Sequence, residues 1–168
     1  MKIFQTILFS KEECDYIINL QKENLQIWDI ANNRNYTSES IYLNNENKHI
    51  FEKLNNFVEK NTDANILSIK NEAHFHTYKL GSYFAKHKDN RNLRVYSVGI
   101  ILNESFEGGD LIIYNNNSEI KINNKIGNAF FFESKFKHEV TPITKGVRFS
   151  LIYFLETENV SLPIKVLI

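Results

Sequence analysis

The chain has 168 residues and a mass of 19.8 kDa, which suits one domain with a substantial core and leaves little room for two. Twenty Lys and Arg residues balance twenty Asp and Glu residues, and no segment concentrates one sign. This balance argues against a general nucleic-acid surface or an anionic-membrane surface. Cys14 is the single cysteine, so neither an intrachain disulfide nor a zinc site made of cysteines can form.

The sequence favours a cytoplasmic protein. The N-terminal run from Ile3 to Phe9 is too short and too interrupted by polar residues for a signal peptide. No apolar run approaches the roughly 20 residues of a membrane-spanning helix, and a lone cysteine fits a reducing compartment. We therefore expect no membrane and no nucleic-acid partner, and either a monomer or a homodimer.

Two amphipathic helices are predicted in the first part of the chain. After a first strand at Ile3 to Leu8, Ser10 and Glu13 form the S-x-x-E pattern of a capping box, so a helix should begin near Lys11. A second helix is expected from about Asn47 to Asn61, because apolar residues recur there at helical spacing. Both helices should pack on a sheet.

Two segments have weaker patterns. The polar stretch from Trp28 to Asn45 predicts a loop with a short strand at Ser40 to Leu43, and it could close over a site as a lid. The apolar run from Leu162 to Ile168 fits either a last strand or a dimer contact.

From Ile66 onward the chain has the pattern of short strands separated by Gly and Asn. The predicted strands are Ile66 to Ile69, Ala73 to Leu80, Tyr83 to His87, Leu93 to Leu102, Leu111 to Tyr114, Glu119 to Ile122, Ala129 to Phe132, His138 to Pro142 and Val147 to Leu155. The order predicts a mainly β (α+β) protein, a double-stranded β-helix or jelly roll with about two N-terminal helices packed on one sheet. Within one domain, 1–168, residues 1–65 would supply helical support and a candidate lid, and residues 66–168 the jelly-roll core.

His87 and Asp89 form an H-x-D motif at the end of one predicted strand. Residues i and i+2 of a strand point to the same side, so an imidazole and a carboxylate can face one metal ion. Two imidazoles and a carboxylate are the ligand set of a non-haem Fe(II) centre, and His138 begins a later strand. A bare H-x-D also arises by chance, so the context of the motif decides.

That context is an ordered succession of motifs: Y-x-x-G (Tyr78 to Gly81), H-x-D, Leu102-Asn103, Phe106 to Leu111, Gly127 to Phe132, His138 to Val140, and Gly146 to Ser150. The succession resembles the Fe(II)/2-oxoglutarate-dependent oxygenases, and most closely their prolyl 4-hydroxylase branch. The similarity spans Tyr78 to Leu155. The Ser10 to Cys14 opening is also similar to that branch.

The resemblance implies a site with no catalytic residue beyond the metal ligands, which would be His87, Asp89 and His138. The far carboxylate of 2-oxoglutarate would be bound by Arg148, Ser150 and Tyr78, because a guanidinium matches a carboxylate and stays charged when buried. Fe(2+) would be the cofactor, 2-oxoglutarate and O2 the co-substrates, and ascorbate a further candidate. The reaction would convert 2-oxoglutarate to succinate and CO2.

Other positions refine this expectation. A halogenase of this superfamily usually lacks the carboxylate, which Asp89 supplies here, and nucleic-acid dealkylases of this fold carry a second arginine where this chain has Phe154. Ser97 shares a strand face with Ile101, which the resemblance turns toward the co-substrate, so Ser97 is a predicted co-substrate contact. Ile101 stands where peptidyl-prolyl members often have Tyr.

His74, His76 and Tyr78 alternate along one predicted strand, so all three should face the same side. An H-x-H pattern suggests a second metal, but no third ligand is left for it, and a polar wall of the substrate pocket is the better interpretation. The predicted substrate-binding residues are His76, Arg94, Phe154 and Trp28. The connection from Asn90 to Leu93 is shorter than the substrate-gripping loop of collagen-type enzymes.

The sequence therefore predicts a dioxygenase that hydroxylates an unactivated C–H bond, with peptidyl proline as the favoured substrate. One alternative is hydroxylation of a free amino acid or another small metabolite. An alternative from another class is a non-catalytic jelly-roll protein that binds a metal as a sensor or binding module.

Overall fold

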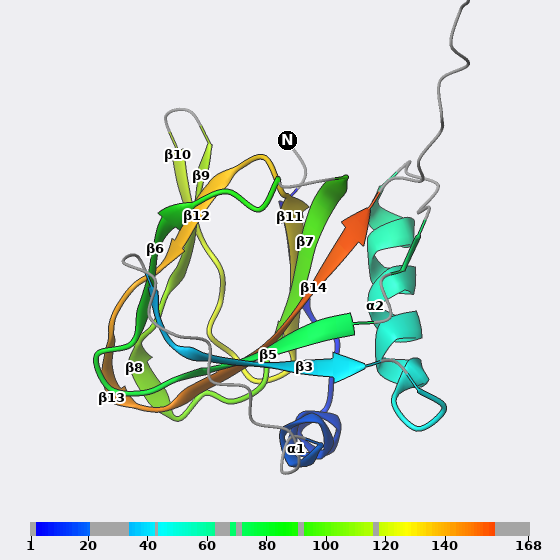
Figure 1. Ribbon diagram of the computed structural model, residues 1–168, viewed down its shortest axis with the longest axis horizontal. Helices are drawn as coiled ribbons and strands as arrows, with labels where there is room; N and C mark the ends of the chain where they lie inside the picture. Colours follow the sequence, from blue (N-terminus) through cyan, green and yellow to red (C-terminus); the bar gives the residue numbers. More distant parts are fainter. Residues whose placement is uncertain are drawn as a thin grey trace, which may run out of the picture.

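The computed structural model describes residues 3–20, 34–42, 44–62, 68–69, 72–90, 93–115 and 118–156. Within them the chain forms antiparallel sheets with two helices, as the jelly-roll prediction requires (Figure 1). The larger, seven-stranded sheet contains in spatial order β1 (Ile3–Ile7), β11 (Asn128–Glu133), β7 (Arg94–Ile101), β14 (Arg148–Glu156), β5 (Glu72–Tyr78) and β3 (Thr37–Tyr42), with β4 (Ser68–Ile69) paired to β14.

A five-stranded sheet faces the larger one. Its strands, in spatial order, are β10 (Ser118–Lys121), β9 (Leu111–Asn115), β12 (Lys137–Val140), β6 (Tyr83–His87) and β2 (Arg34–Asn35). A separate two-stranded sheet pairs β8 (Phe106–Gly108) with β13 (Ile143–Gly146). The predicted strands after residue 66 are thus present, and the pair β8 and β13 is an addition that the sequence pattern did not predict.

Both predicted helices are confirmed. Helix α1 (Lys11–Asn19) begins with the expected capping box: the Glu13 backbone N–H donates to Ser10 Oγ at 3.2 Å, and the Ser10 backbone N–H donates to the Glu13 carboxylate at 2.7 Å. Helix α2 (Lys48–Asn61) buries the apolar side chains whose spacing predicted it, namely Ile50, Phe51, Leu54, Phe57 and Val58. Neither helix is long and apolar enough to cross a membrane.

The prediction of a loop between the helices is wrong for residues 34–35 and 37–39, which lie in β2 and in the first half of β3. The short strand predicted at Ser40 to Leu43 is present as far as Tyr42 as the second half of β3, which pairs along its whole length with β5. A polar strand at the edge of a sheet needs only backbone pairing on one side, so its sequence lacks a strong apolar pattern. The remaining parts of the predicted lid, with Trp28, and the apolar run from Leu162 to Ile168 lie outside the described residues.

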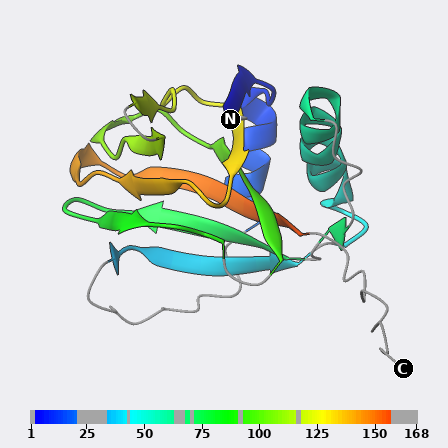
Figure 2. The same cartoon turned by 90° about the horizontal axis from the view of Figure 1, so that it is seen from above.

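Two buried layers result. The outer layer lies between the helices and the larger sheet, and both views show the helices on the side of that sheet away from β6, β9 and β12 (Figures 1 and 2). The inner layer lies between the two main sheets and contains aromatic and aliphatic side chains such as Tyr78, Ile101, Phe130 and Phe132. It also holds buried polar side chains, among them His76, His138, Arg148 and Ser150. These polar groups mark the candidate site.

Candidate metal centre

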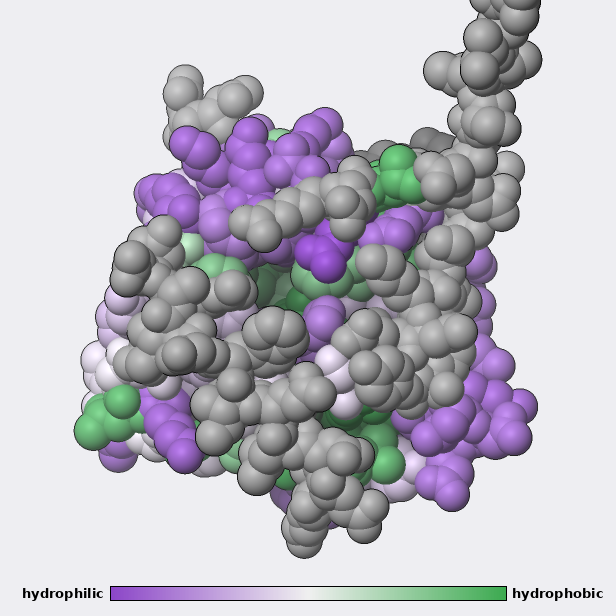
Figure 3. All heavy atoms as spheres, viewed as in Figure 1, coloured by the Kyte–Doolittle hydropathy of each residue, from purple (hydrophilic) through white to green (hydrophobic). Residues whose placement is uncertain are grey.

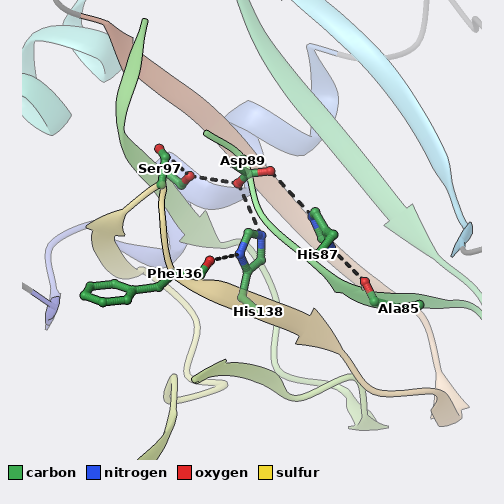
Figure 4. Close-up of polar contacts among 7 residues, drawn as sticks. Ala85, His87, Asp89, Ser97, Phe136 and His138 are labelled. Carbon is green, nitrogen blue, oxygen red and sulfur yellow. Dashed lines mark hydrogen bonds and ion pairs between the residues drawn. The ribbon is translucent and has the colours of Figure 1, made fainter. Parts of the chain in front are cut away.

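Two neighbouring strands bring the predicted metal ligands together. His87 on β6 and His138 on β12 are direct partners in an antiparallel pair, so their side chains lie on the same face of the smaller sheet. Asp89 follows β6 by two residues and turns its carboxylate toward both rings (Figure 4). One ligand atom from each of the three residues lies within 4.8 Å of the others. Elsewhere in the described residues no comparable cluster of His, Cys, Asp and Glu occurs.

Both histidines turn their Nε2 atoms toward the carboxylate of Asp89. His87 Nδ1 lies 2.7 Å from the carbonyl oxygen of Ala85, and His138 Nδ1 lies 3.2 Å from that of Phe136. A carbonyl oxygen only accepts hydrogen bonds, so each Nδ1 carries a proton, and Nε2 is the ring atom left to bind a metal. The two Nε2 atoms lie 3.5 Å and 3.2 Å from the oxygens of Asp89. The two imidazoles and the carboxylate therefore converge on one point, and this donor set fits Fe(II).

Two serines fix the position of Asp89, Ser97 through the carboxylate and Ser134 through Ser97 and the backbone. Ser97 Oγ donates to Asp89 Oδ2 at 2.7 Å and lies 3.0 Å from Ser134 Oγ. The backbone N–H of Asp89 also donates to the carbonyl of Ser134 at 3.1 Å. Burial opposes ionisation of Asp89, but its contacts with His138, His87 and Ser97 outweigh burial and hold its pKa well below the ordinary value. Asp89 is therefore ionised at neutral pH, as a metal ligand needs to be.

Ser97 was predicted to contact the co-substrate. Its hydroxyl faces the site, as its strand position predicts, and it contacts Asp89 and Ser134, so it also orients the carboxylate of Asp89. Ser134 was missed by sequence reasoning. It lies fully buried in the turn between β11 and β12, and a serine in a turn carries no signal of a contact with a residue 45 positions earlier (134 − 89).

Aromatic rings enclose the two histidines. The ring of Phe84 stacks on His87 with 3.6 Å between centroids, and the ring of Phe132 meets His138 edge-on at 4.7 Å. Tyr36 packs against Phe84 from the corner between β2 and β3. These rings limit rotation of the imidazoles and reduce water around them. In the space-filling view, hydrophobic residues lie recessed between hydrophilic ones near the middle of this face (Figure 3).

Arg148 is a buried cation next to the predicted partners. Only 1% of its surface is exposed, its Nη1 donates to Ser150 Oγ at 2.9 Å, and its guanidinium carbon lies 5.2 Å from the centre of the Tyr78 ring. Its Nε has no hydrogen-bond partner, and no carboxylate among the described residues forms an ion pair with it. Burial lowers the pKa of Arg148, yet a guanidinium remains charged. A buried charge without a counter-ion is costly, so the site is suited to a ligand carboxylate.

The predicted substrate residues Arg94 and Phe154 lie in contact. The guanidinium carbon of Arg94 sits 3.6 Å from the centre of the Phe154 ring, and Arg94 Nε lies 3.9 Å from Glu156 Oε1. A bulge makes this contact: the β7–β14 register shifts so that Arg94, in place of Val95, stands opposite Glu156. Regular alternation would put Arg94 on the opposite face from Ser97, and the bulge returns it to the site face.

His76 is buried on the same face, with 9% of its surface exposed. Its ring lies against Tyr36 and Tyr78, with centroid distances of 4.7 Å and 6.1 Å. The strand position of His76 thus matches the prediction that it faces the site. The fourth predicted substrate residue, Trp28, lies outside the described residues.

Comparison with known proteins agrees with this geometry. The family model described as "2OG-Fe(II) oxygenase superfamily" matches residues 73–156, which is half of the 168 residues and includes all three metal-ligand candidates. The chain therefore belongs to the 2OG-Fe(II) oxygenase superfamily. This confirms the family predicted from the ordered motifs, and the family implies Fe(2+) and 2-oxoglutarate.

Curated relatives match over part of their length. A PKHD-type hydroxylase from Alteromonas mediterranea is 37% identical over 54 residues, which cover 32% of this chain and 24% of the relative. A PKHD-type hydroxylase from Idiomarina loihiensis is 27% identical over 86 residues, covering 48% of this chain and 39% of the relative. The matched regions thus span less than half of either relative.

Solved structures share the fold over most of the chain. A prolyl-4-hydroxylase from Pseudomonas putida has a TM-score of 0.77 at 19% identity and 92% coverage of both chains. The viral collagen prolyl hydroxylase of Paramecium bursaria Chlorella virus-1 has a TM-score of 0.75 at 19% identity, with 94% and 97% coverage of this chain and that one. A Trichoplax adhaerens prolyl hydroxylase, in complex with a peptide of the hypoxia inducible factor oxygen degradation domain, has a TM-score of 0.74 at 20% identity, with 94% and 83% coverage. These likenesses confirm the jelly-roll fold.

Proposed function

We propose that the chain is an Fe(II)/2-oxoglutarate-dependent dioxygenase that hydroxylates an unactivated C–H bond. The observation that carries this proposal is the convergence of two Nε2 atoms and one ionised carboxylate, at His87, His138 and Asp89, in the same layer as the buried cation Arg148. The three ligands would hold iron. Arg148, Ser150 and Tyr78 would hold the far carboxylate of 2-oxoglutarate.

Iron and 2-oxoglutarate, when bound, would supply the oxidising chemistry: one oxygen atom of O2 would enter the substrate and the other would enter succinate, with release of CO2. The chain's own residues orient the participants. Ser97 and Ser134 hold Asp89 in one orientation, and Phe84 and Phe132 hold the imidazoles and exclude water. Three protein ligands would leave room on a bound metal for the co-substrate and O2.

Peptidyl proline is the substrate that we favour. The folds of the prolyl hydroxylases from P. putida and T. adhaerens support it, and so does the Arg94–Phe154 pair, which offers a donor edge and an apolar face to a peptide. The short connection from Asp89 to Arg94 favours the second candidate, a free amino acid or small metabolite, because it leaves less chain to grip a peptide. A cytoplasmic location, a monomeric or homodimeric state and a response to ascorbate belong to the same proposal.

The first experiment is an anaerobic titration with Fe(II) and 2-oxoglutarate, followed by visible absorption. We expect the charge-transfer band of the chelate to appear. Aerobic succinate formation is then measured with proline-containing peptides and with free amino acids, each with and without ascorbate. A band without succinate from any substrate would favour a metal-binding sensor, and the absence of the band would contradict the proposal.

A further inference from the structure

His76 is a buried polar group that the metal centre does not use. Its imidazole is more than nine-tenths buried, and it makes no hydrogen bond with any residue that the structure describes. Its ring lies next to the rings of Tyr36, Tyr78 and His74. Buried polar groups nearly always have a partner, so an unpartnered imidazole on the site face points to a ligand.

The strand register places His76 beside the cation Arg148. His76 on β5 stands directly opposite Ser150 on β14, and directly opposed side chains have Cβ atoms about 4.5–5.5 Å apart. Arg148 reaches the same Ser150 through its Nη1, at 2.9 Å from Oγ. The Arg148 guanidinium is therefore turned along β14 toward Ser150, and His76 lies beside Ser150 on the neighbouring strand.

On its other side, Ser150 has no polar neighbour in the sheet. It stands opposite Ile101 on β7, and the fully buried Ile101 side chain carries no hydrogen-bond donor. A carboxylate placed against Arg148 and Ser150 can therefore find further donors on the β5 side, where Tyr78 and His76 lie. His76 is the member of this pair that directly faces Ser150.

The ionisation state of His76 suits a neutral donor. Burial lowers its pKa well below the ordinary value, and the neighbouring His74 and Arg148 lower it further. A neutral imidazole offers one N–H donor, and it avoids placing a second cation next to Arg148. The residue can thus donate a hydrogen bond to an anion without adding charge repulsion against Arg148.

We propose that His76 donates a hydrogen bond to the far carboxylate of 2-oxoglutarate, beside Arg148 and Ser150. The inference rests on the proposed function of the site and deepens it. It moves His76 from the substrate wall, where sequence reasoning put it, to the co-substrate site. In this assignment the imidazole on β5 provides the donor that Ile101 on β7 does not.

The test compares two 2-oxo acids on the anaerobic, Fe(II)-loaded full chain. 2-Oxoglutarate carries the far carboxylate, and 2-oxopentanoate has the same chelating end and chain length without it. His76→Leu should weaken 2-oxoglutarate binding by about 10- to 100-fold, the range of a hydrogen bond to a charged group. It should change 2-oxopentanoate binding by less than about twofold. The charge-transfer band reports both affinities.

His74→Leu is the matched control, because His74 lies on the same face of β5 but stands opposite Ile152. It should leave both affinities unchanged, while His76→Gln, which keeps an N–H donor, should regain part of the 2-oxoglutarate affinity. Equal 2-oxoglutarate affinity in the unchanged chain and in His76→Leu would overturn the inference, as would equal weakening of both acids. If the unchanged chain gives no band with either acid, the proposed function itself fails and this inference falls with it.

Discussion

The two faces of the central strands β7 and β14 differ in chemistry. The outward face packs apolar side chains against the helices and belongs to the outer layer, with Val98, Ile100, Leu151 and Tyr153. The inward face of the same strands carries Ser97, Arg148 and Ser150, all at most 2% exposed. Because side chains alternate along a strand, one pair of strands can build a core on one side and a reactive site on the other.

The layers also differ in how their buried polar groups are satisfied. In the outer layer, the Tyr153 hydroxyl donates to Asn55 Oδ1 at 2.9 Å, so this polar pair is complete. In the inner layer, Arg148 keeps an Nε without a partner, and the imidazole of His76 has none among the described residues. Outer-layer changes should therefore act on stability, and inner-layer changes on ligand binding.

Asp89→Ala should have the largest effect on metal binding. Removing the carboxylate leaves two imidazoles, which bind Fe(II) far more weakly than the complete set. We expect the anaerobic charge-transfer band to disappear. The free energy of unfolding of the metal-free protein should also fall, because the carboxylate accepts a hydrogen bond from Ser97 and its contacts outweigh its burial. Asp15→Ala on the exposed face of α1 is the control and should keep the band. A full band in Asp89→Ala would refute the metal assignment.

Leu54→Ala should lower the stability of the fold and leave Fe(II) binding unchanged. Leu54 is fully buried on α2 in the outer layer, and truncation of a buried leucine costs about 2–5 kcal/mol of unfolding free energy. Urea denaturation measures this loss, and the remaining folded protein should bind Fe(II) with unchanged affinity. Leu80→Ala, at a side chain that is 71% exposed, is the control and should change neither quantity. A selective loss of Fe(II) binding in Leu54→Ala would show that the layers are coupled.

Arg148→Met should separate binding from stability within one residue. Loss of the guanidinium leaves the co-substrate carboxylate unpaired, which should weaken 2-oxoglutarate binding by about 2–5 kcal/mol. The same change removes an uncompensated buried charge and keeps the side-chain volume, so thermal unfolding of the ligand-free protein should occur at the same or a higher temperature. A large drop in that temperature would mean that Arg148 has a structural partner in the ligand-free state.

The sequence predicts those site residues that lie close together in the chain at a regular spacing. His87 and Asp89 are two residues apart on one strand face, and Arg148 and Ser150 repeat that spacing on another. The capping box at Ser10 and the periodicity of α2 are equally local, and the structure contains both. Patterns of this kind depend on the backbone period alone.

The features that sequence reasoning missed depend on contacts through space. The bulge beside Arg94 shifts the strand phase by one residue, and Ser134 reaches Asp89 from a turn on the neighbouring chain segment. The polar strand β3 is fixed by pairing with β5, which its own composition does not predict. Each case requires knowledge of which strand lies next to which.

Ser134→Ala should have a smaller effect than the ligand changes. It removes the hydroxyl that contacts Ser97 but keeps the backbone carbonyl that binds the N–H of Asp89. We expect Fe(II) affinity to fall by about 10-fold, in the range known for residues behind a metal ligand, and the spectrum of the bound Fe(II) centre to shift. Ser134→Thr keeps a hydroxyl and should restore part of the affinity. Unchanged affinity and spectrum in Ser134→Ala would mean that Ser97 holds Asp89 alone.

The smallest effect is expected at Cys14, whose thiol reports how well the outer layer excludes water and reagents. Burial raises the pKa of this thiol from 9.0 to about 11, so the folded state keeps the proton at a pH where the unfolded chain loses it. The free energy of unfolding should therefore decrease as the pH rises from about 9 toward 11, and Cys14→Ala should make that decrease smaller. At pH 8 the native thiol should resist alkylation by iodoacetamide, while the urea-unfolded chain reacts. Equal alkylation rates in both states would show that α1 opens readily and that the outer layer is not the closed core which its packing indicates.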